Sequence, residues 1–205
     1  MKPNLSLILI LFLIGCSETS KKNEMVLDIK TVSKNVKPTF AQKDFNRKLD
    51  SESGKSIINI ESIQLNSLPT ELYDQIQATV IKMDCISFPC ITKLSSKISQ
   101  LKNLKELYIA KSSLIEIPTE IPTLSNLEIL TIAGGGKLKS IPESFGDLIN
   151  LQEVNLWRNN LSTLPSTITK LKNLKKINLI ENNISKEERL KIKKHLPNCD
   201  IKFEY

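Results

Sequence analysis

The sequence predicts a repeat solenoid of the α/β class, in which successive units stack and each adds one short strand to a parallel β-sheet. The first observation is a repeat. From residue 55 onward, aliphatic residues recur at the same places in units of 23 to 26 residues. The second observation is that two of the aliphatic residues in each unit are two positions apart, as are residues on one side of a strand. A strand this short cannot bury its side chains alone, so the units must stack. The six units are 55–77, 78–103, 104–126, 127–150, 151–173 and 174–198.

The composition agrees with one domain that has an aliphatic core. Of the 205 residues, 40% are hydrophobic and only 5% are aromatic. A chain of this length can bury a substantial core. The formal net charge is +7, and lysines gather in the C-terminal units. Because these lysines alternate with Leu and Ile, we interpret them as a solvated outer face and expect no nucleic-acid partner.

The N-terminal stretch MKPNLSLILILFLIGCSETSKK has the features of an export signal in the expected order, namely a positive charge, an apolar run and then small residues. Lys2 is followed by an apolar run at 5–14, which is well short of the roughly 20 residues that a spanning helix needs. The tetrapeptide LIGC at 13–16 resembles the lipobox of bacterial lipoproteins, and this resemblance implies lipid on Cys16. We therefore expect a signal peptide at 1–15 and a membrane anchor through the lipid. An ordinary secretory signal is the alternative.

Two further segments precede the repeats. Residues 16–38 begin with the lipidated cysteine and are polar and rich in Ser and Lys, which predicts a flexible tether. Residues 39–54 contain Phe40 and Phe45 and are too apolar for a pure linker, so they could form an N-terminal cap over the first unit.

Two of the units overlay without a gap, LKELYIAKSSLIEIPTEIPTLSN at 104–126 and LQEVNLWRNNLSTLPSTITKLKN at 151–173. In both, aliphatic residues occupy positions 1, 4, 6, 11, 14, 18 and 21, with proline at 15 and asparagine at 23. The pattern resembles the leucine-rich repeat family, in its bacterial, spirochaete-like form with the unit LxxLxLxxNxLxxLPxxIxxLxN, over about 70% of the chain. The resemblance implies a horseshoe arc with a concave parallel sheet of six to seven strands and convex irregular or short-helical segments.

The turns within the units have their own residue types. Asn159 and Asn182 occupy the family's turn-asparagine position, where an amide can bond backbone groups that would otherwise be unpaired. Prolines open the convex segments, where a fixed φ suits the chain and no ladder donor is lost. They are Pro118, Pro142 and Pro165.

The fourth unit departs from the pattern. It contains AGGGK at 133–137 and one residue more than its neighbours, while Ser112 replaces the turn asparagine in the third unit. A phosphate-binding loop would need a following Lys-Ser/Thr pair and a helix. We expect instead that the glycines let the turn bulge around an inserted residue.

The last unit changes character. Ser185, followed three residues later by Glu188, forms a capping box, so a true helix is predicted there. Residues 199–205 are predicted to add a capping strand at the end of the sheet.

Cysteine and histidine usage limits the chemistry. Cys85 and Cys90 could form a disulfide around an inserted loop in an exported protein, or could be two buried thiols. His195 is the only histidine, so neither a catalytic triad nor a metal site can be assembled with specificity. We expect no catalytic residues, no metal and no cofactor, and therefore not an enzyme.

The concave face is the predicted binding surface. Position 7 of four neighbouring units forms an apolar row of Ala110, Ala133, Trp157 and Ile180. Apolar side chains scattered singly over a surface are ordinary, but those in a parallel sheet are contiguous. The candidate ligand-binding residues are Trp157, Tyr108, Ile180, Arg158, Thr131, Ile129 and Asn155.

These observations predict a lipid-anchored envelope protein whose concave face binds a protein partner. The partner is not identified by the sequence, and we expect the protein itself to be a monomer. The resemblance to spirochaete envelope proteins implies the outer membrane or cell surface, with a host component as one kind of partner. The alternative is a periplasmic scaffold that binds the cell's own envelope components or polysaccharide.

Overall fold

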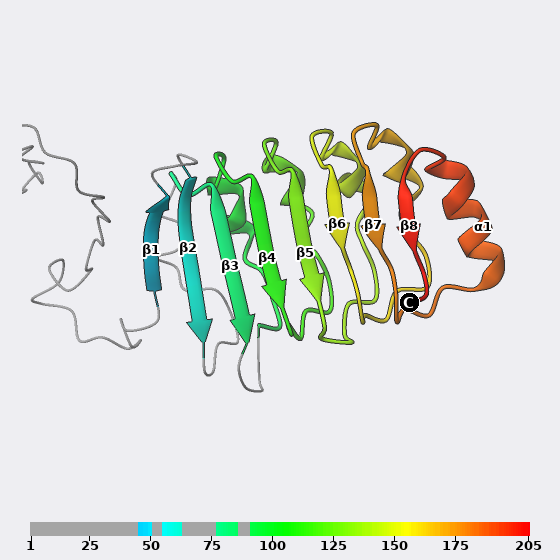
Figure 1. The fold of residues 1–205 in the computed structure, drawn as a ribbon, viewed down its shortest axis with the longest axis horizontal. Coiled ribbons are helices and arrows are strands. Elements are labelled where there is room, and N and C mark those ends of the chain that lie inside the picture. The colour runs from blue at the N-terminus through cyan, green and yellow to red at the C-terminus, as the bar shows by residue number, and fades with distance from the viewer. Residues whose placement is uncertain (1–44, 51–54, 63–76, 86–90) are drawn as a thin grey trace, which may run out of the picture.

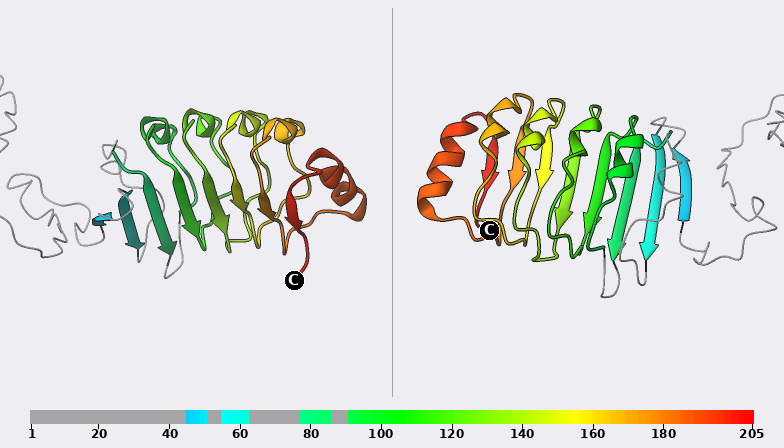
Figure 2. Two further views of the ribbon diagram at one scale, coloured as in Figure 1. Left: turned by 45° about the horizontal axis from the view of Figure 1, so that its top comes forward. Right: turned by 180° about the vertical axis from the view of Figure 1, so that it is seen from behind.

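The computed structural model describes residues 45–50, 55–62, 77–85 and 91–205 (Figure 1). Eight strands form one sheet in chain order, and the short helical turns of the units lie along one of its faces (Figure 2). The strands are β1 Phe45–Asp50, β2 Lys55–Ser62, β3 Val80–Cys85, β4 Glu106–Ala110, β5 Ile129–Ala133, β6 Glu153–Asn155, β7 Lys176–Asn178 and β8 Asp200–Lys202. The helical segments are η4 Ser96–Gln100, η5 Ile121–Thr123, η6 Glu143–Asp147, η7 Ser166–Lys170 and α1 Lys186–His195.

The sheet is parallel from β2 to β8, which confirms the predicted solenoid and its strand number. Each strand pairs with the strand of the next unit without any crossover. The prediction did not include β1, which pairs antiparallel with β2 and lies within the segment predicted as a cap. It pairs with the edge of β2 that faces away from β3, so β2 does not present that edge to another chain.

The predicted aliphatic positions form the core. In the unit 104–126, all seven of them are buried, and the same holds for 151–173. Burying one such side chain contributes about 1.5–3 kcal/mol to the free energy of folding. Because each unit contacts only its neighbours, the core is a continuous column beneath the sheet rather than a central cluster.

The convex segments are single 3-10 turns, as the short-helical prediction expects. Pro142 and Pro165 are the N-caps of η6 and η7, and the Pro118 carbonyl accepts from Ile121 N at the start of η5. Glu143 also links two turns, because its carboxylate accepts hydrogen bonds from Ser166 and Thr167 in the next unit. These bonds lower the pKa of Glu143.

Two ladders of asparagine side chains join the units. Asn159 Nδ2 donates to Ile132 O at 2.8 Å, and Asn182 Nδ2 donates to Leu156 O at 2.9 Å, as the turn position predicts. The second ladder was not predicted. It uses the asparagine that ends each unit, whose Nδ2 donates to a carbonyl one unit earlier in Asn126, Asn150 and Asn173. Both ladders satisfy carbonyls that the bending chain leaves without a sheet partner.

The eighth position of four successive units has a left-handed backbone. It holds Lys111 (φ 54°), Gly134 (φ 80°), Arg158 (φ 53°) and Glu181 (φ 57°). Gly134 therefore adopts a conformation that its neighbours adopt without glycine, at a cost of about 1 kcal/mol each. Gly135 has a different role, since an added Cβ would lie 1.3 Å from the Ser112 carbonyl oxygen. The glycines thus allow a close approach between two units, and the bulge around an inserted residue stays a prediction.

The C-terminal end of the arc is covered by α1 and β8. Ser185 is the N-cap of α1, and its hydroxyl accepts from Glu188 N at 3.2 Å. The Glu188 carboxylate accepts from Thr163 of the preceding unit at 2.6 Å, so it ties the helix to the solenoid. The strand β8 lies within the segment predicted to end the sheet.

Several predictions concern residues that the structure does not describe. The signal peptide at 1–15, the lipidated Cys16 and the tether at 16–38 lie outside the described residues. Cys90 and the side chain of Cys85 also lie outside the described part of the chain, so their disulfide stays a prediction. Within the described ranges, none of the helices has the length and apolar character needed to cross a membrane.

Candidate functional site

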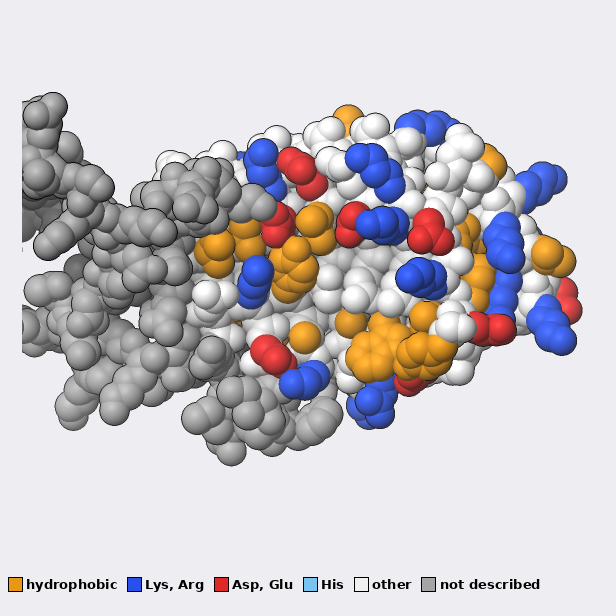
Figure 3. All heavy atoms as spheres, viewed as in Figure 1, with side chains coloured by type: hydrophobic (Ala, Val, Ile, Leu, Met, Phe, Trp, Pro, Cys, Tyr) orange, Lys and Arg blue, Asp and Glu red, His pale blue; other side chains and the backbone are white. Residues whose placement is uncertain are grey.

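The face of the sheet opposite the 3-10 turns carries the predicted binding residues in the predicted register. Position 5 runs across the strands as Lys82, Tyr108, Thr131, Asn155, Asn178 and Lys202. Position 3 runs beside it as Val80, Glu106, Ile129, Glu153, Lys176 and Asp200. Figure 3 views this face and shows side chains of both charges interspersed over it, with a hydrophobic patch near the ends of β6 and β7.

A hollow of about 250 Å³ lies over β4 to β8 on this face. Four of the predicted site residues line it, namely Tyr108, Ile129, Thr131 and Asn155. The rest of the lining was not among the candidates and consists of the apolar Val154 and Ile177 and the polar or charged Glu153, Lys176, Asn178, Asp200 and Lys202. The structure therefore brings together one part of the predicted site and extends it toward β8.

Tyr108 closes the β4 end of the hollow. Its hydroxyl donates to Glu106 Oε2 at 3.0 Å, and Lys82 Nζ lies 5.3 Å from the centroid of its ring. Partial burial, the bond to Glu106 and the charge of that carboxylate raise the pKa of Tyr108 to about 12. The phenol is therefore a neutral donor and an aromatic wall at physiological pH.

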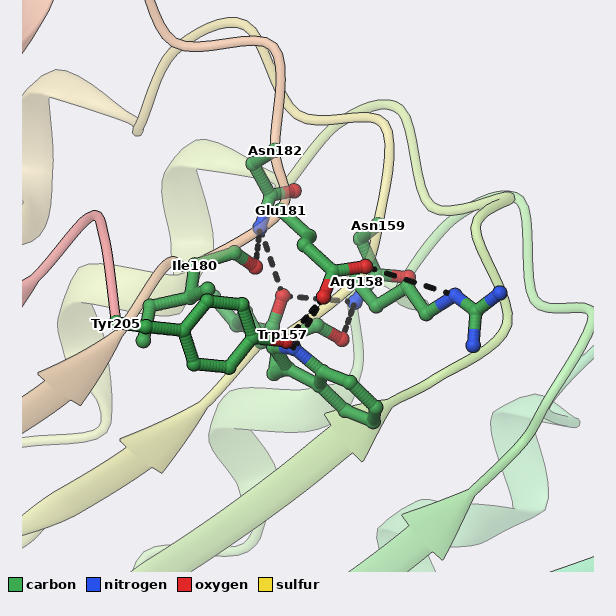
Figure 4. A network of polar contacts seen from close by, with 8 residues as sticks. Trp157, Arg158, Asn159, Ile180, Glu181, Asn182 and Tyr205 are labelled. Carbon is green, nitrogen blue, oxygen red and sulfur yellow. Dashed lines mark hydrogen bonds and ion pairs between the residues drawn. The ribbon is translucent and has the colours of Figure 1, made fainter.

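The other predicted residues gather beyond the ends of β6 and β7 in a separate cluster around Trp157 (Figure 4). Trp157 Nε1 donates to Glu181 Oε1 at 3.3 Å and to Tyr205 Oη at 3.1 Å. The Tyr205 hydroxyl donates to the same carboxylate, which raises the pKa of Tyr205. The Arg158 guanidinium lies 5.9 Å from the indole centroid and 3.7 Å from Glu181. We call Trp157, Arg158, Glu181 and Tyr205 the aromatic cluster.

The aromatic cluster shows why Trp157 occupies its position. The indole is half-buried, and its Cζ3 lies 3.6 Å from the place where a Cβ on Gly134 would be. The ring therefore packs over a glycine of the preceding unit. The Tyr205 side chain is 92% exposed, so its hydroxyl holds an otherwise open ring beside the indole.

The predicted apolar row is not an open strip. Ile180 is only 7% exposed and Ala133 only 6%, so neither offers much surface to a ligand. The low exposure of Ile180 disfavours a direct contact with a ligand, and its role in binding stays a prediction. It is correctly placed on the concave side, but the surface at this end of the sheet belongs to Trp157 and Tyr205.

Sequence reasoning missed Tyr205 because the residue lies outside the repeat, where no period indicates which way the chain turns. It missed Asn178 and Lys202 as site residues although both lie in the position-5 row. Their signal was available, since they extend the same row by one and two strands.

The described residues offer little reactive chemistry. Cys199 is a free thiol, and its pKa is raised to about 11, mainly by burial. A raised pKa keeps the thiol protonated and unreactive at neutral pH. In the part of the chain that the structure describes, no three His, Cys, Asp or Glu side chains gather as metal ligands would.

Comparisons with known proteins agree with this architecture. The family model described as Leucine Rich Repeat matches residues 150–171. Over 91 residues, or 44% of the chain, the sequence is 42% identical to an Arabidopsis thaliana protein named for disease resistance, but it spans only 7% of that protein.

Solved structures are similar over a larger part of the chain. A leucine-rich-repeat protein of Leptospira interrogans matches with a TM-score of 0.60 and 34% identity, over 69% of this chain and 37% of that one. The leucine-rich repeat domain of the type III effector XopL matches with a TM-score of 0.57 and 23% identity, over 63% of this chain and 45% of that one. At that identity, the second likeness shows the fold alone.

The typical members of this repeat class act as binding scaffolds rather than enzymes. The parallel sheet, the stacked units with their asparagine ladder and the matches above lead to one conclusion: the chain has the leucine-rich-repeat fold, an open solenoid arc that generally mediates protein–protein interaction.

Proposed function

We propose that the chain is an exported, lipid-anchored binding protein that recognises a protein partner through its concave face. The observation that carries this proposal is the aromatic cluster, in which a half-buried tryptophan and an exposed tyrosine stand beside a polar hollow. Large aromatic side chains and arginine are the residues that most often dominate the energy of protein interfaces. The cluster combines both types with a carboxylate that orients them.

Hydrogen bonds and an ion pair also hold the side chains of the aromatic cluster in place. Three groups surround the Glu181 carboxylate, namely the indole N–H, the Tyr205 hydroxyl and the Arg158 guanidinium. Fixing the rings in advance reduces the conformational entropy that is lost when a partner binds. A partner with an apolar surface and an acidic rim would complement the rings and the exposed Arg158.

Replacing Trp157 with alanine should remove the anchor. We expect Trp157→Ala to lower affinity for the partner by more than about tenfold, since interface hot spots contribute about 2 kcal/mol or more. The measurement is capture from envelope or host-cell extracts by the immobilised protein, with bound proteins quantified by mass spectrometry. Leu190→Ala is the matched control, because Leu190 is an exposed apolar residue of α1. Equal amounts of captured protein with Trp157→Ala and with the natural protein would contradict the proposal.

The membrane anchor rests on the sequence at 13–16. Two or more acyl chains, each adding about 0.8 kcal/mol per buried methylene, give stable attachment without a spanning helix. We expect labelled palmitate to enter the natural protein, and Cys16→Ala to release the protein from the membrane fraction. A Cys16→Ala variant that stays membrane-bound would contradict the anchor.

We further propose that the protein is attached to the outer membrane or cell surface, where a host component could be its partner. Protease treatment of intact cells distinguishes this location from a periplasmic scaffold, because only an outward-facing protein is digested. Survival of the protein in intact cells, with digestion after the outer membrane is opened, would favour the scaffold alternative.

A further inference from the structure

The floor of the hollow is a row of hydrogen-bond donors. Asn155 Oδ1 accepts from Trp157 N at 3.1 Å, and Asn178 Oδ1 accepts from Ile180 N at 3.1 Å. Because only the amide oxygen can accept from a backbone N–H, these bonds fix the orientation of both side chains. The two Nδ2 groups are thereby left as donors in the lining of the hollow.

These donors have no partner within the described chain. None of the residues that the structure describes accepts from Nδ2 of Asn155 or Asn178, from the Thr131 hydroxyl or from Lys202 Nζ. The four side chains stand on successive strands, β5 to β8, in one register row. Thr131, Asn155 and Asn178 are half-buried and Lys202 is exposed, and a ligand that carries acceptor oxygens can bond to all four donors.

The charge of the hollow argues against a polyion as ligand. Lys176 Nζ lies 3.1 Å from Glu153 Oε1, and these two side chains neutralise each other. Asp200 and Lys202, both on β8, carry opposite charges. The lining therefore has no net charge, and an uncharged ligand suits it.

The spacing of the donors distinguishes two kinds of extended ligand. Neighbouring strands lie about 4.8 Å apart, so the row offers one donor at this interval. An extended polypeptide presents the same side only at every second residue, which gives a repeat of about 6.7 Å. This repeat does not match the spacing of about 4.8 Å between neighbouring donors of the row. A linear chain of pyranose rings advances by close to one strand spacing per ring. Every ring carries acceptor oxygens on both of its edges, so each ring presents an acceptor to the row even where successive rings are turned over.

We propose that this hollow binds a linear, uncharged oligosaccharide, which lies across strands β5 to β8 with about one pyranose ring per strand. Thr131, Asn155, Asn178 and Lys202 donate to its oxygens, and the ring of Tyr108 packs against the sugar at the β4 end. The site is separate from the aromatic cluster, so it does not depend on a protein partner being bound there.

The test uses three defined probes, the β-1,4-linked hexasaccharides chitohexaose and cellohexaose and the β-1,3-linked laminarihexaose. Binding is measured by titration calorimetry and by the fluorescence of Trp157, the only tryptophan, whose backbone N–H bonds to Asn155. We expect saturable binding of at least one probe at millimolar concentrations. Asn155→Asp and Asn178→Asp keep the oxygen that accepts from the backbone but remove the Nδ2 donor.

Each of these substitutions should weaken the binding by about tenfold, the equivalent of one lost hydrogen bond to a ligand. Asn198→Asp is the matched control, since Asn198 is exposed and outside the hollow, and it should bind like the natural protein. Absence of binding by all three probes, or equal binding by the two hollow variants, would overturn the proposal. Capture of a protein partner that is lost in the hollow variants, without sugar binding, would assign the hollow to that partner instead. If Trp157→Ala loses the captured protein but still binds the sugar, the aromatic cluster and the hollow are two separate sites.

Discussion

Replacing Gly135 with alanine is expected to destabilise the protein by about 3 kcal/mol or more, because overpacking against rigid atoms costs at least this much when neither side can move. The added Cβ would lie 1.3 Å from the carbonyl oxygen of Ser112 and 2.5 Å from its carbonyl carbon. Both are backbone atoms, so a change of rotamer cannot relieve the overlap. The units 104–126 and 127–150 would have to separate at this turn.

Urea denaturation followed by Trp157 fluorescence measures the effect. The tryptophan is a suitable reporter, since its ring packs over Gly134, the residue before the substitution. Gly136→Ala is the control that isolates backbone conformation, because Gly136 has a positive φ of 66° but no atom within 4 Å of an added Cβ. It should cost about 1 kcal/mol. Equal losses in the two variants would show that the close approach to Ser112 is not the cause.

Replacing Phe145 with alanine is expected to cost about 3–5 kcal/mol in the free energy of unfolding. Phe145 is fully buried and is among the largest buried side chains of the described residues. The neighbouring units carry Ile121 and Ile168 at the same place on the convex side, so the phenyl ring fills extra volume in the fourth unit. Alanine would leave a cavity that cannot readily close, because Glu143 ties η6, the turn that carries Phe145, to the neighbouring turn η7.

The control is Phe145→Ile, which installs the side chain that the neighbouring units use. It should cost clearly less than Phe145→Ala, about 1.5 kcal/mol, because isoleucine removes less buried volume and leaves a smaller cavity. Both variants can be compared by thermal and urea unfolding. A loss of less than about 1 kcal/mol in Phe145→Ala would mean that the turns collapse into the cavity and that their packing is adaptable.

The repeat predicted more of this molecule than any single motif. A unit of nearly constant length that stacks without crossovers fixes the register of the parallel strands, so the rows that contain Tyr108 and Trp157 could be written down from the sequence. The aliphatic positions and the turn asparagines followed from the same alignment. The predicted rows matched because the interactions between units repeat along the chain.

The remaining features depend on contacts that do not repeat. Tyr205 reaches Trp157 only because the segment after β8 turns back toward β6, and no period describes that turn. Ile180 lies at the same end of the arc, and its burial likewise depends on contacts that do not repeat. The free Nδ2 groups of Asn155 and Asn178 depend on how the backbone leaves each strand, which is a matter of hydrogen-bond geometry rather than residue type.

The close contact between Gly135 and Ser112 also has an evolutionary consequence. Genes for tandem repeats lengthen and shorten when misaligned copies recombine, and such an exchange changes which unit stands beside which. The unit 127–150 is different, because its glycine requires a neighbour whose backbone can come within contact of it. A rearrangement that separated this unit from the unit before it would place a different turn against Gly135, so we expect the two units to be exchanged or lost together.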